Sequence, residues 1–286
     1  MLPVVFFHDR FLGPGERASV SILDRGYLLG DSVFASTRSF AGRPLALDMH
    51  LARFREGARG LGLDVPNGEA LEAIVREACE RFGEGHGYVR VTASRGEGAP
   101  GLLPDPMATT TLSVVVRAMA APFPAPVRVG VAGLRAPPAE CLDPSWKLGS
   151  YAARVVMRRE AAERGHGEAV VLGVTGEVVS GIASNLLVFE GPDVWTPALS
   201  VGCRPGVTRE LCLRLLSSLG VSVTERRAGV DALARATSVV FTSALLPLVA
   251  ASAFDDVPLE VSPELLGKLR AAYEETTGLH PPRARS

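Results

Sequence analysis

The sequence predicts a mixed α/β protein (α/β or α+β) with two domains. Helical segments with one apolar face alternate with strand-like segments in which apolar and polar residues take turns. A proline-rich stretch, AAPFPAPVRV at 120–129, separates two such series. With 286 residues, 47% of them apolar, the chain can bury a substantial core. We therefore expect a small N-terminal α/β domain over residues 1–120 and a larger C-terminal domain over residues 121–286.

In the N-terminal half, strands and helices follow from residue spacing. Strands are expected at 4–8, 18–23, 33–47, 88–96 and 109–119, with the third folded into two strands at Ala41–Gly42. Helices are expected at 49–63, ending at Gly62, and at 69–83, ending at Gly83. The segment 24–32, DRGYLLGDS, has the composition of a turn.

The C-terminal half continues the alternation. Strands are expected at 127–134, 169–174, 176–181, 184–191 and 239–244, the second and third joined by a turn at Thr175–Gly176. Helices are expected at about 150–164, at 206–220 and at 263–278. In the second of these helices Thr208 is the expected N-cap and Gly220 the stop.

Charge and composition exclude several classes of function. The formal net charge of −1 leaves no basic excess for nucleic acid or an anionic membrane. The N-terminal segment has no basic region before its apolar patch, so it does not resemble a signal peptide, and no apolar run is long enough to cross a bilayer. The four cysteines are scattered and have no histidine at ligand spacing, so neither disulfides nor a metal site are expected. We expect a soluble cytoplasmic protein.

The scarcity of lysine singles out one residue. The chain has 30 Lys and Arg residues, but only Lys147 and Lys268 are lysines. Lysine can lose its proton and form a Schiff base with a carbonyl group, and an arginine guanidinium cannot. Lys268 lies in the C-terminal amphipathic helix, where a solvated charge is expected. Lys147 lies between a proline-containing loop and a helix, which makes it the candidate nucleophile.

A carbonyl partner for Lys147 points to pyridoxal 5′-phosphate, whose phosphate needs its own site. The segment PGVTRELCL at 205–213 opens a helix, and the free N–H groups of a helix start attract phosphate. Arg53 could add a charge-assisted hydrogen bond. Taken alone, a capped helix start and a helix arginine are also common in proteins that bind no phosphate.

The order of these motifs resembles the class IV aminotransferase family, the pyridoxal phosphate enzymes of fold type IV. The stretches that carry the resemblance are DRGYLLGDSVFAS (24–36), HLARF (50–54), WKLGSY (146–151), GEVVSGIASNLLVF (176–189), PGVTRELC (205–212) and TSALLPL (242–248). The resemblance runs from about Ser21 to Leu259. It implies two α/β domains with the cofactor between them, a small-molecule substrate with an amino group, and a homodimer.

The resemblance also implies roles for individual residues. Lys147 corresponds to the lysine that forms the Schiff base with the cofactor. Arg53 and the N–H groups of Val207 and Thr208 correspond to the phosphate ligands. Ser243 falls in the loop that closes over phosphate and substrate, and Tyr151 follows the lysine closely enough to approach the cofactor ring.

Ser180 departs from the family pattern. It stands five residues before Asn185, where the family usually has a glutamate beside the pyridine nitrogen of the cofactor. A serine hydroxyl can hydrogen-bond that nitrogen but cannot supply the negative charge that keeps it protonated. We read the change as a shift toward elimination and away from transamination. Glu177 could take over the role only by a shift of the hairpin, since on a regular strand it faces the opposite side from Ser180.

The reaction itself is predicted from this departure and from the C-terminal motifs. They favour 4-amino-4-deoxychorismate lyase, which releases pyruvate and 4-aminobenzoate. The alternatives are an aminotransferase of the D-amino-acid or branched-chain type and a paralogue that binds the cofactor without turnover. A protein that binds no cofactor is a further alternative.

The group that binds an anionic substrate is left open by the sequence. The loop 94–102 has Pro100 where some family members have arginine. Arg38 and Arg95 are therefore the alternatives for substrate binding, and a structural role for each is an equal expectation.

Overall fold

The structure, a computed structural model, describes residues 2–260 and 263–279. The described chain forms two compact units. The first contains residues 2–121 and 145–151, and the second contains 122–144, 152–260 and 263–279. The segment with Lys147 therefore packs with the first unit, although it follows part of the second in the chain. A division into functional domains at residues 120 and 121 stays a proposal.

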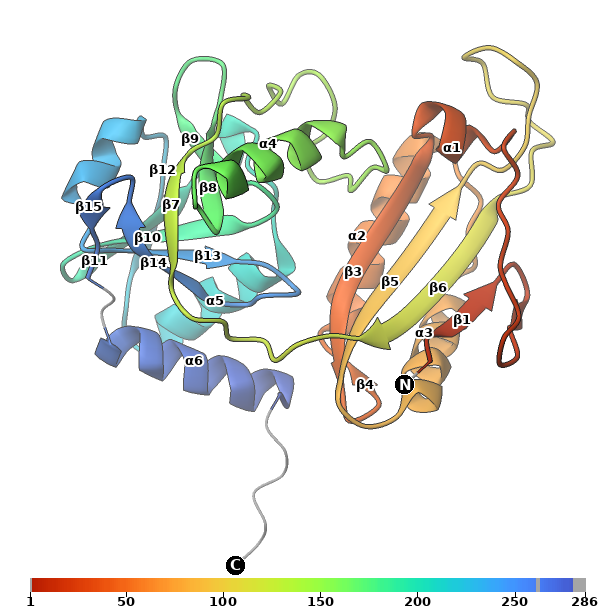
Figure 1. The fold of residues 1–286 in the computed structure, drawn as a ribbon, viewed down its shortest axis with the longest axis horizontal. Coiled ribbons are helices and arrows are strands. Elements are labelled where there is room, and N and C mark those ends of the chain that lie inside the picture. The colour runs from red at the N-terminus through yellow and green to blue at the C-terminus, as the bar shows by residue number, and fades with distance from the viewer. Residues whose placement is uncertain (1, 261–262, 280–286) are drawn as a thin grey trace, which may run out of the picture. The chain divides into compact units, whose positions relative to one another are not determined.

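The first unit is an antiparallel sheet covered on one face by two helices (Figure 1). Its strand order is β2-β1-β6-β5-β3-β4. The strands are β1 (Val4–Phe7), β2 (Arg10–Phe11), β3 (Ser32–Phe40), β4 (Arg43–Pro44), β5 (His86–Ser94) and β6 (Thr111–Ala118). The helices are α1 (Arg25–Leu29), α2 (Leu47–Leu61) and α3 (Gly68–Phe82), of which α2 and α3 cover the sheet.

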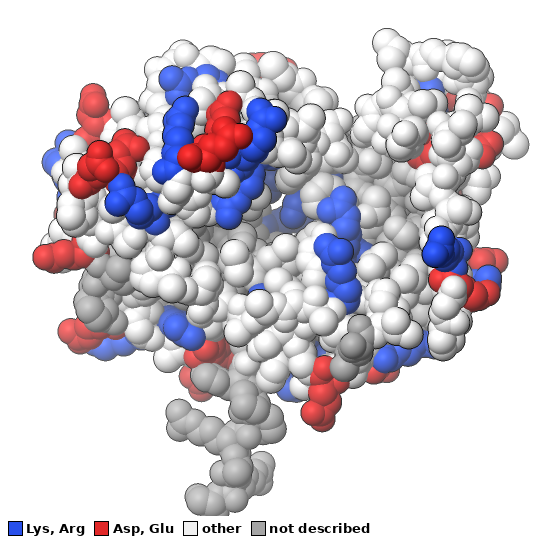
Figure 2. Space-filling model, viewed as in Figure 1, with Lys and Arg blue, Asp and Glu red and all other residues white. Residues whose placement is uncertain are grey.

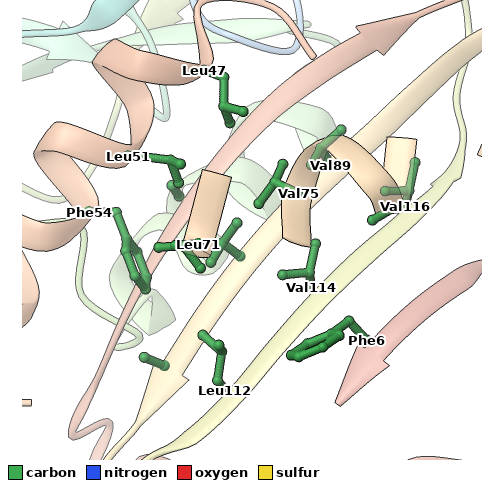
Figure 3. Close-up of a cluster of buried hydrophobic side chains, with 14 of the residues drawn as sticks. Phe6, Leu47, Leu51, Phe54, Leu71, Val75, Val89, Leu112, Val114 and Val116 are labelled. Atoms are coloured by element: carbon green, nitrogen blue, oxygen red, sulfur yellow. The ribbon is translucent and has the colours of Figure 1, made fainter. Parts of the chain in front are cut away.

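The core of the first unit lies between these two helices and the sheet (Figure 3). Leu51 and Phe54 of α2 and Leu71 and Val75 of α3 pack on the apolar side chains of β3, β5 and β6. Because side chains alternate along a strand, Phe34 of β3 and Arg90 of β5 lie on the opposite face of the sheet, whereas Thr37 and Ser39 share the helix-covered face with Val33. Lys147 contacts the Phe34 ring on that second face.

The second unit is a mixed sheet of strand order β12-β11-β10-β13-β14-β7-β8-β9, with β15 paired to β14. The strands are β7 (Val127–Val131), β8 (Glu168–Leu172), β9 (Val178–Gly181), β10 (Asn185–Glu190), β11 (Asp193–Pro197), β12 (Val223–Arg226), β13 (Ser238–Thr242), β14 (Val249–Phe254) and β15 (Val257–Pro258). The helices are α4 (Ala152–Glu163), α5 (Val207–Ser218) and α6 (Pro263–Thr277), with short 3-10 turns at Leu199–Val201 and Val230–Arg235.

Three local expectations are wrong. Residues 18–23 form no strand, because their alternation finds no partner strand, and Ile22 is left 75% exposed. The segment expected as a turn at 24–32 contains α1, which begins because the Asp24 carboxylate accepts hydrogen bonds from the N–H groups of Gly26 and Tyr27. The N-cap of α5 is Gly206, so Thr208 lies inside the first turn.

No helix among the described residues is long and apolar enough to cross a membrane. Acidic and basic side chains are interspersed over much of the face drawn in Figure 2, which agrees with the balanced net charge. The described residues also contain no group of three or more His, Cys, Asp or Glu side chains that could hold a metal ion.

Candidate functional site

The backbone around Lys147 is fixed by pairing with β3. The Phe34 N–H donates to the Lys147 carbonyl at 2.8 Å, and the Gly149 N–H donates to the Ser32 carbonyl at 2.8 Å. Val33 and Leu148 form an isolated antiparallel bridge between these two hydrogen bonds. Since β4 pairs only with the far end of β3, the segment occupies the edge that β4 leaves open. The lysine is thus held on a rigid strand.

The ring of Phe34 gathers three side chains on the outer face of the sheet. Lys147 Nζ lies 4.8 Å from the ring centroid, and Arg90 Cζ lies 3.7 Å from it. The Tyr151 ring packs edge-on against Phe34 with centroids 5.1 Å apart. Phe34 therefore contacts the candidate nucleophile, an arginine and a tyrosine.

Helix α2 brings two further basic groups to Lys147. His50 and Arg53 are three residues apart, so they share one face of the helix. Burial, together with the positive charges of Lys147 and Arg53, lowers the pKa of His50 to about 3. The imidazole is therefore neutral at physiological pH. The positive charges beside it make this part of the first unit suited to an anion such as a phosphate.

In the second unit, the N-terminus of α5 is built to accept an anion. Gly206 is the N-cap and supplies no side-chain hydrogen bond. The first N–H groups of a helix have no acceptor within the helix and carry a partial positive charge. Val207 and Thr208, the predicted phosphate ligands, are the first two residues of α5, and both are buried.

Asn185 holds the turn that precedes α5. Its side-chain Nδ2 donates to the Arg204 carbonyl at 2.8 Å and to Cys203 Sγ at 3.3 Å. A Cβ atom at Gly206 would lie 2.0 Å from Asn185 Oδ1, so only glycine leaves room for this contact. On β13, Thr242 is the pairing partner of Asn185. Asn185 therefore connects the start of α5 to the end of β13.

Ser243, which follows Thr242, uses its hydroxyl within its own loop. The Ser243 Oγ donates to the Leu246 carbonyl and accepts from the Leu246 N–H, both at 3.1 Å. These bonds shape the 243–246 turn. Its predicted role as a loop residue over phosphate and substrate stays a prediction.

Three buried hydroxyls in the second unit have no hydrogen-bond partner. Ser180 Oγ on β9 and Ser238 Oγ and Thr242 Oγ1 on β13 are all buried and unpartnered. Leaving such a group unsatisfied costs about 1–3 kcal/mol, so an orphaned hydroxyl points to a missing partner. A ring nitrogen, which accepts a hydrogen bond when neutral, is a fitting partner for Ser180.

Glu177 does not stand in for Ser180. It precedes β9, in the turn between β8 and β9, and its carboxylate accepts a hydrogen bond from the Thr175 hydroxyl. That bond lowers the pKa of Glu177. The strand after it is irregular, with a register shift opposite Val171 and Leu172, so strand alternation does not settle where Glu177 points. Its hydrogen bond within the turn does.

A family model described as amino-transferase class IV matches residues 32–254. The chain belongs to this family. A putative branched-chain-amino-acid aminotransferase of Methanocaldococcus jannaschii is 28% identical over 229 residues, 77% of each chain. An aminodeoxychorismate lyase of Bacillus subtilis is 25% identical over 260 residues, 89% of this chain and 87% of the relative.

The fold agrees with a solved structure that contains the cofactor. An aminotransferase of Brucella abortus, bound to the cofactor PLP, superposes with a TM-score of 0.89 at 26% identity, over 96% of this chain and 99% of that one. The architecture is therefore that of fold type IV, and the cofactor is pyridoxal 5′-phosphate. The chain is a transaminase or a lyase of this class.

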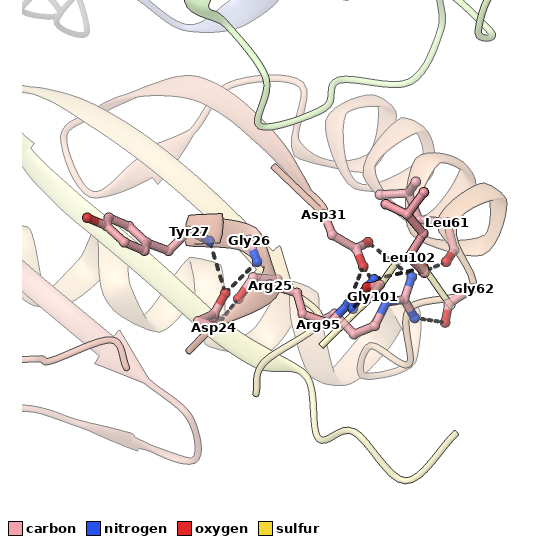
Figure 4. Close-up of polar contacts among 11 residues, drawn as sticks. Asp24, Arg25, Gly26, Tyr27, Asp31, Leu61, Gly62, Arg95, Gly101 and Leu102 are labelled. Atoms are coloured by element: carbon pink, nitrogen blue, oxygen red, sulfur yellow. Dashed lines mark hydrogen bonds and ion pairs between the residues drawn. The ribbon is translucent and has the colours of Figure 1, made fainter. Parts of the chain in front are cut away.

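The two arginines considered for substrate binding are used by the fold. Arg38 is fully buried, and its Nη2 donates to the Ala120 carbonyl. Arg95 donates to both oxygens of Asp31, at 2.7 and 3.1 Å, and to the carbonyls of Leu61 and Gly62 (Figure 4). Each has the structural role that the sequence left open.

Arg90 is a candidate site residue that was not singled out from the sequence. Its Nε donates to Thr92 Oγ1 at 3.1 Å, and no carboxylate of the described residues forms an ion pair with it. The signal was available, because Arg90 interrupts the apolar alternation of Val89 and Val91 and must face away from the core. Lys268, by contrast, forms an exposed ion pair with Glu264 at 2.7 Å, as a solvated charge would.

Proposed function

We propose that this protein is an amino-acid aminotransferase of the branched-chain or D-amino-acid type, with Lys147 as the lysine that binds pyridoxal phosphate. The fixed position of Lys147 on the edge of β3, among basic groups, is the observation that carries the proposal. The branched-chain relative and the solved aminotransferase favour this reading over the lyase that the sequence analysis put first.

The remaining site residues are assigned by their chemistry. Arg53 and the N–H groups of Val207 and Thr208 hold the phosphate, which they suit as a cation and a helix start. The hydroxyl of Ser180 bonds the ring nitrogen, and Tyr151 lies along the ring. When bound, the cofactor withdraws electrons from the substrate Cα. The Nζ of Lys147, once released by the substrate amino group, would take the proton from that carbon and deliver it to C4′ of the cofactor.

Arg90 is the proposed partner of the substrate carboxylate. Its guanidinium and Lys147 Nζ both contact the Phe34 ring, and they come from opposite sides of β3, so a substrate carboxylate on Arg90 and an amino group near Lys147 would flank that ring. Arg38 is fully buried with one donor on the Ala120 carbonyl, and Arg95 has its donors on Asp31 and on backbone carbonyls, so neither is favoured for this role.

The lyase is the second candidate, and Ser180 is the observation that favours it. A hydroxyl leaves the ring nitrogen without the negative charge that favours its protonation. A less protonated ring delocalises the charge at Cα less well, and this penalises transamination more than loss of a leaving group.

One experiment separates the candidates. The purified protein is mixed in turn with L-leucine, D-alanine and aminodeoxychorismate, and the visible absorbance band of the bound cofactor is followed. The proposal predicts conversion to the pyridoxamine form with one of the amino acids, and a rise of the half-saturating concentration of about tenfold or more in Arg90→Met. Pyruvate release from aminodeoxychorismate with the band retained would establish the lyase instead. No reaction with any of the three would indicate the paralogue without turnover.

A further inference from the structure

Trp146, the residue before Lys147, lies directly on the backbone of α2. A Cβ atom at Gly60 would lie 2.2 Å from Trp146 Cζ2 and 2.4 Å from Cε2. One turn earlier, a Cβ atom at Gly57 would lie 3.7 Å from Trp146 Cα and Cβ. Residues three apart share a helix face, so the two glycines together form a seat for the tryptophan, in which only a side chain at Gly60 would clash with Trp146, because 3.7 Å at Gly57 is an ordinary contact.

Neither glycine has a positive φ, so the backbone conformation does not require glycine at these positions. The space taken by neighbouring side chains does. Glycine is the poorest helix former after proline, so two glycines in the last turns of α2 work against the helix itself. Gly57 also faces Val33, whose Cγ2 would lie 2.9 Å from an added Cβ. For Gly60, the three nearest atoms all belong to the ring of Trp146. The absence of a side chain at Gly60 therefore makes room for the Trp146 ring.

Lys147 is thus held from two sides. Its own carbonyl and the Gly149 N–H pair with β3, and the preceding Trp146 rests on α2. Strand pairing fixes the backbone of Lys147 but does not by itself set the direction of its four-carbon side chain. Fixing the direction of the neighbouring residue as well limits the orientations from which Lys147 can reach its partner.

We propose that Trp146, packed on Gly57 and Gly60, is a positioning residue that fixes the direction in which the Lys147 side chain extends toward the cofactor. This inference rests on the proposed function, which assigns Lys147 as the cofactor-binding lysine. A methyl group at Gly60 should push the Trp146 ring away from α2, and the orientation of Lys147 should change as a result.

The test compares Gly60→Ala, Trp146→Leu and the double variant, each as the purified protein with its cofactor. Two readouts need no substrate: the pH midpoint of the visible cofactor band, and the rate at which hydroxylamine removes that band. Gly60→Ala should move the midpoint by about half a pH unit or more and change the hydroxylamine rate about fivefold or more. In the Trp146→Leu background, Gly60→Ala should change neither the pH midpoint nor the hydroxylamine rate, because the ring that its methyl group would meet is absent.

The control is Gly267→Ala, which adds the same methyl group within helix α6 where nothing lies within 4 Å. It should leave both readouts at the wild-type values. If Gly60→Ala does not fold, Trp146→Leu and the double variant still decide, because neither contains the clash. They should match each other and both differ from wild type.

The inference is overturned if Gly60→Ala and Trp146→Leu both keep the wild-type midpoint and rate, or if the effects of the two substitutions simply add. Lys147→Ala separates this failure from a failure of the proposed function. Retention of the visible band in Lys147→Ala would contradict the proposed function itself. Loss of that band, with an unchanged Gly60→Ala, would contradict the positioning role alone.

Discussion

Asp31 is the residue that holds two buried arginines in the first unit. Its carboxylate pairs with Arg95 at 2.7 Å and with Arg25 at 3.2 Å, and Arg25 also donates to the Gly101 and Leu102 carbonyls (Figure 4). Burial alone would raise the pKa of Asp31, but the hydrogen bonds from the two arginines outweigh it and hold that pKa below its usual value. The network ties α1, the end of α2 and the loop after β5 together.

Removing this charge should destabilise the fold. Asp31→Asn leaves two buried guanidinium groups without their counter-charge, and we expect a loss of about 3 kcal/mol in the free energy of unfolding at pH 7. Urea unfolding measures it, with Asp64→Asn, an exposed aspartate, as the control that should change little. A loss no larger than that of the control would contradict this account of the network.

The lowered pKa of Asp31 predicts that the stabilisation by its carboxylate depends on pH. Because the pKa of Asp31 is lower in the folded state than in the unfolded state, its stabilisation is fully present above the unfolded value of about 4 and is lost as the pH falls through the folded value. The difference in unfolding free energy between wild type and Asp31→Asn should therefore shrink below about pH 4. A difference that is constant from pH 7 down to pH 3 would argue against the assignment.

At this scale the sequence identified Lys147 because of its rarity, and the structure placed it on a strand edge beside other basic groups. The sequence could not show which arginine is best placed to bind a substrate. The sequence alone does not show which arginines have their donors used by backbone carbonyls, as Arg38 and Arg95 do. The hydrogen-bond partners of these arginines come from chain segments far apart in sequence. For this reason Arg90 was not considered from the sequence alone.

At the scale of elements, the start of α5 depends on a single glycine. In Gly206→Ala the added Cβ would fall 2.0 Å from Asn185 Oδ1, so the asparagine and the first turn of α5 must move apart. We expect the dissociation constant of pyridoxal phosphate to rise about tenfold or more, since the phosphate is proposed to bind that turn. Absorbance titration of the protein with the cofactor measures it.

Gly229→Ala is the matched control for this prediction. Gly229 is also an N-cap, with φ −75°, and nothing lies within 4 Å of an added Cβ. It should bind the cofactor as wild type does. Equal binding by Gly206→Ala and Gly229→Ala would show that the phosphate does not depend on the start of α5.

The elements were predicted unevenly. Helices α2 and α3 have strong apolar faces and end at Gly62 and Gly83, as expected, because both signals are local. Strands β11, β12 and β14 were not expected, although β11 pairs with β10 and β14 with β13, their neighbours in the chain, while β12 pairs with the more distant β11. Thr208 was expected as a cap from its residue type, but Gly206 takes that place because Asn185 packs against it.

At the scale of the whole molecule, the order of motifs along the chain predicted the family and the cofactor. The same order did not decide the reaction. The family includes enzymes that do different chemistry with pyridoxal phosphate. We propose that the reaction depends on single groups such as Ser180 and Arg90, whose surroundings only the folded chain defines.

The central claim is that Lys147 carries the cofactor, and the lysine content of the chain makes it directly testable. The purified protein is reduced with sodium borohydride, digested, and mapped by mass spectrometry for the peptide that bears the phosphopyridoxyl group. Because the sequence contains only Lys147 and Lys268, a lysine-bound group has two possible positions. We predict that it lies on Lys147 alone. Attachment to Lys268, or reduction without any labelled lysine, would contradict the account.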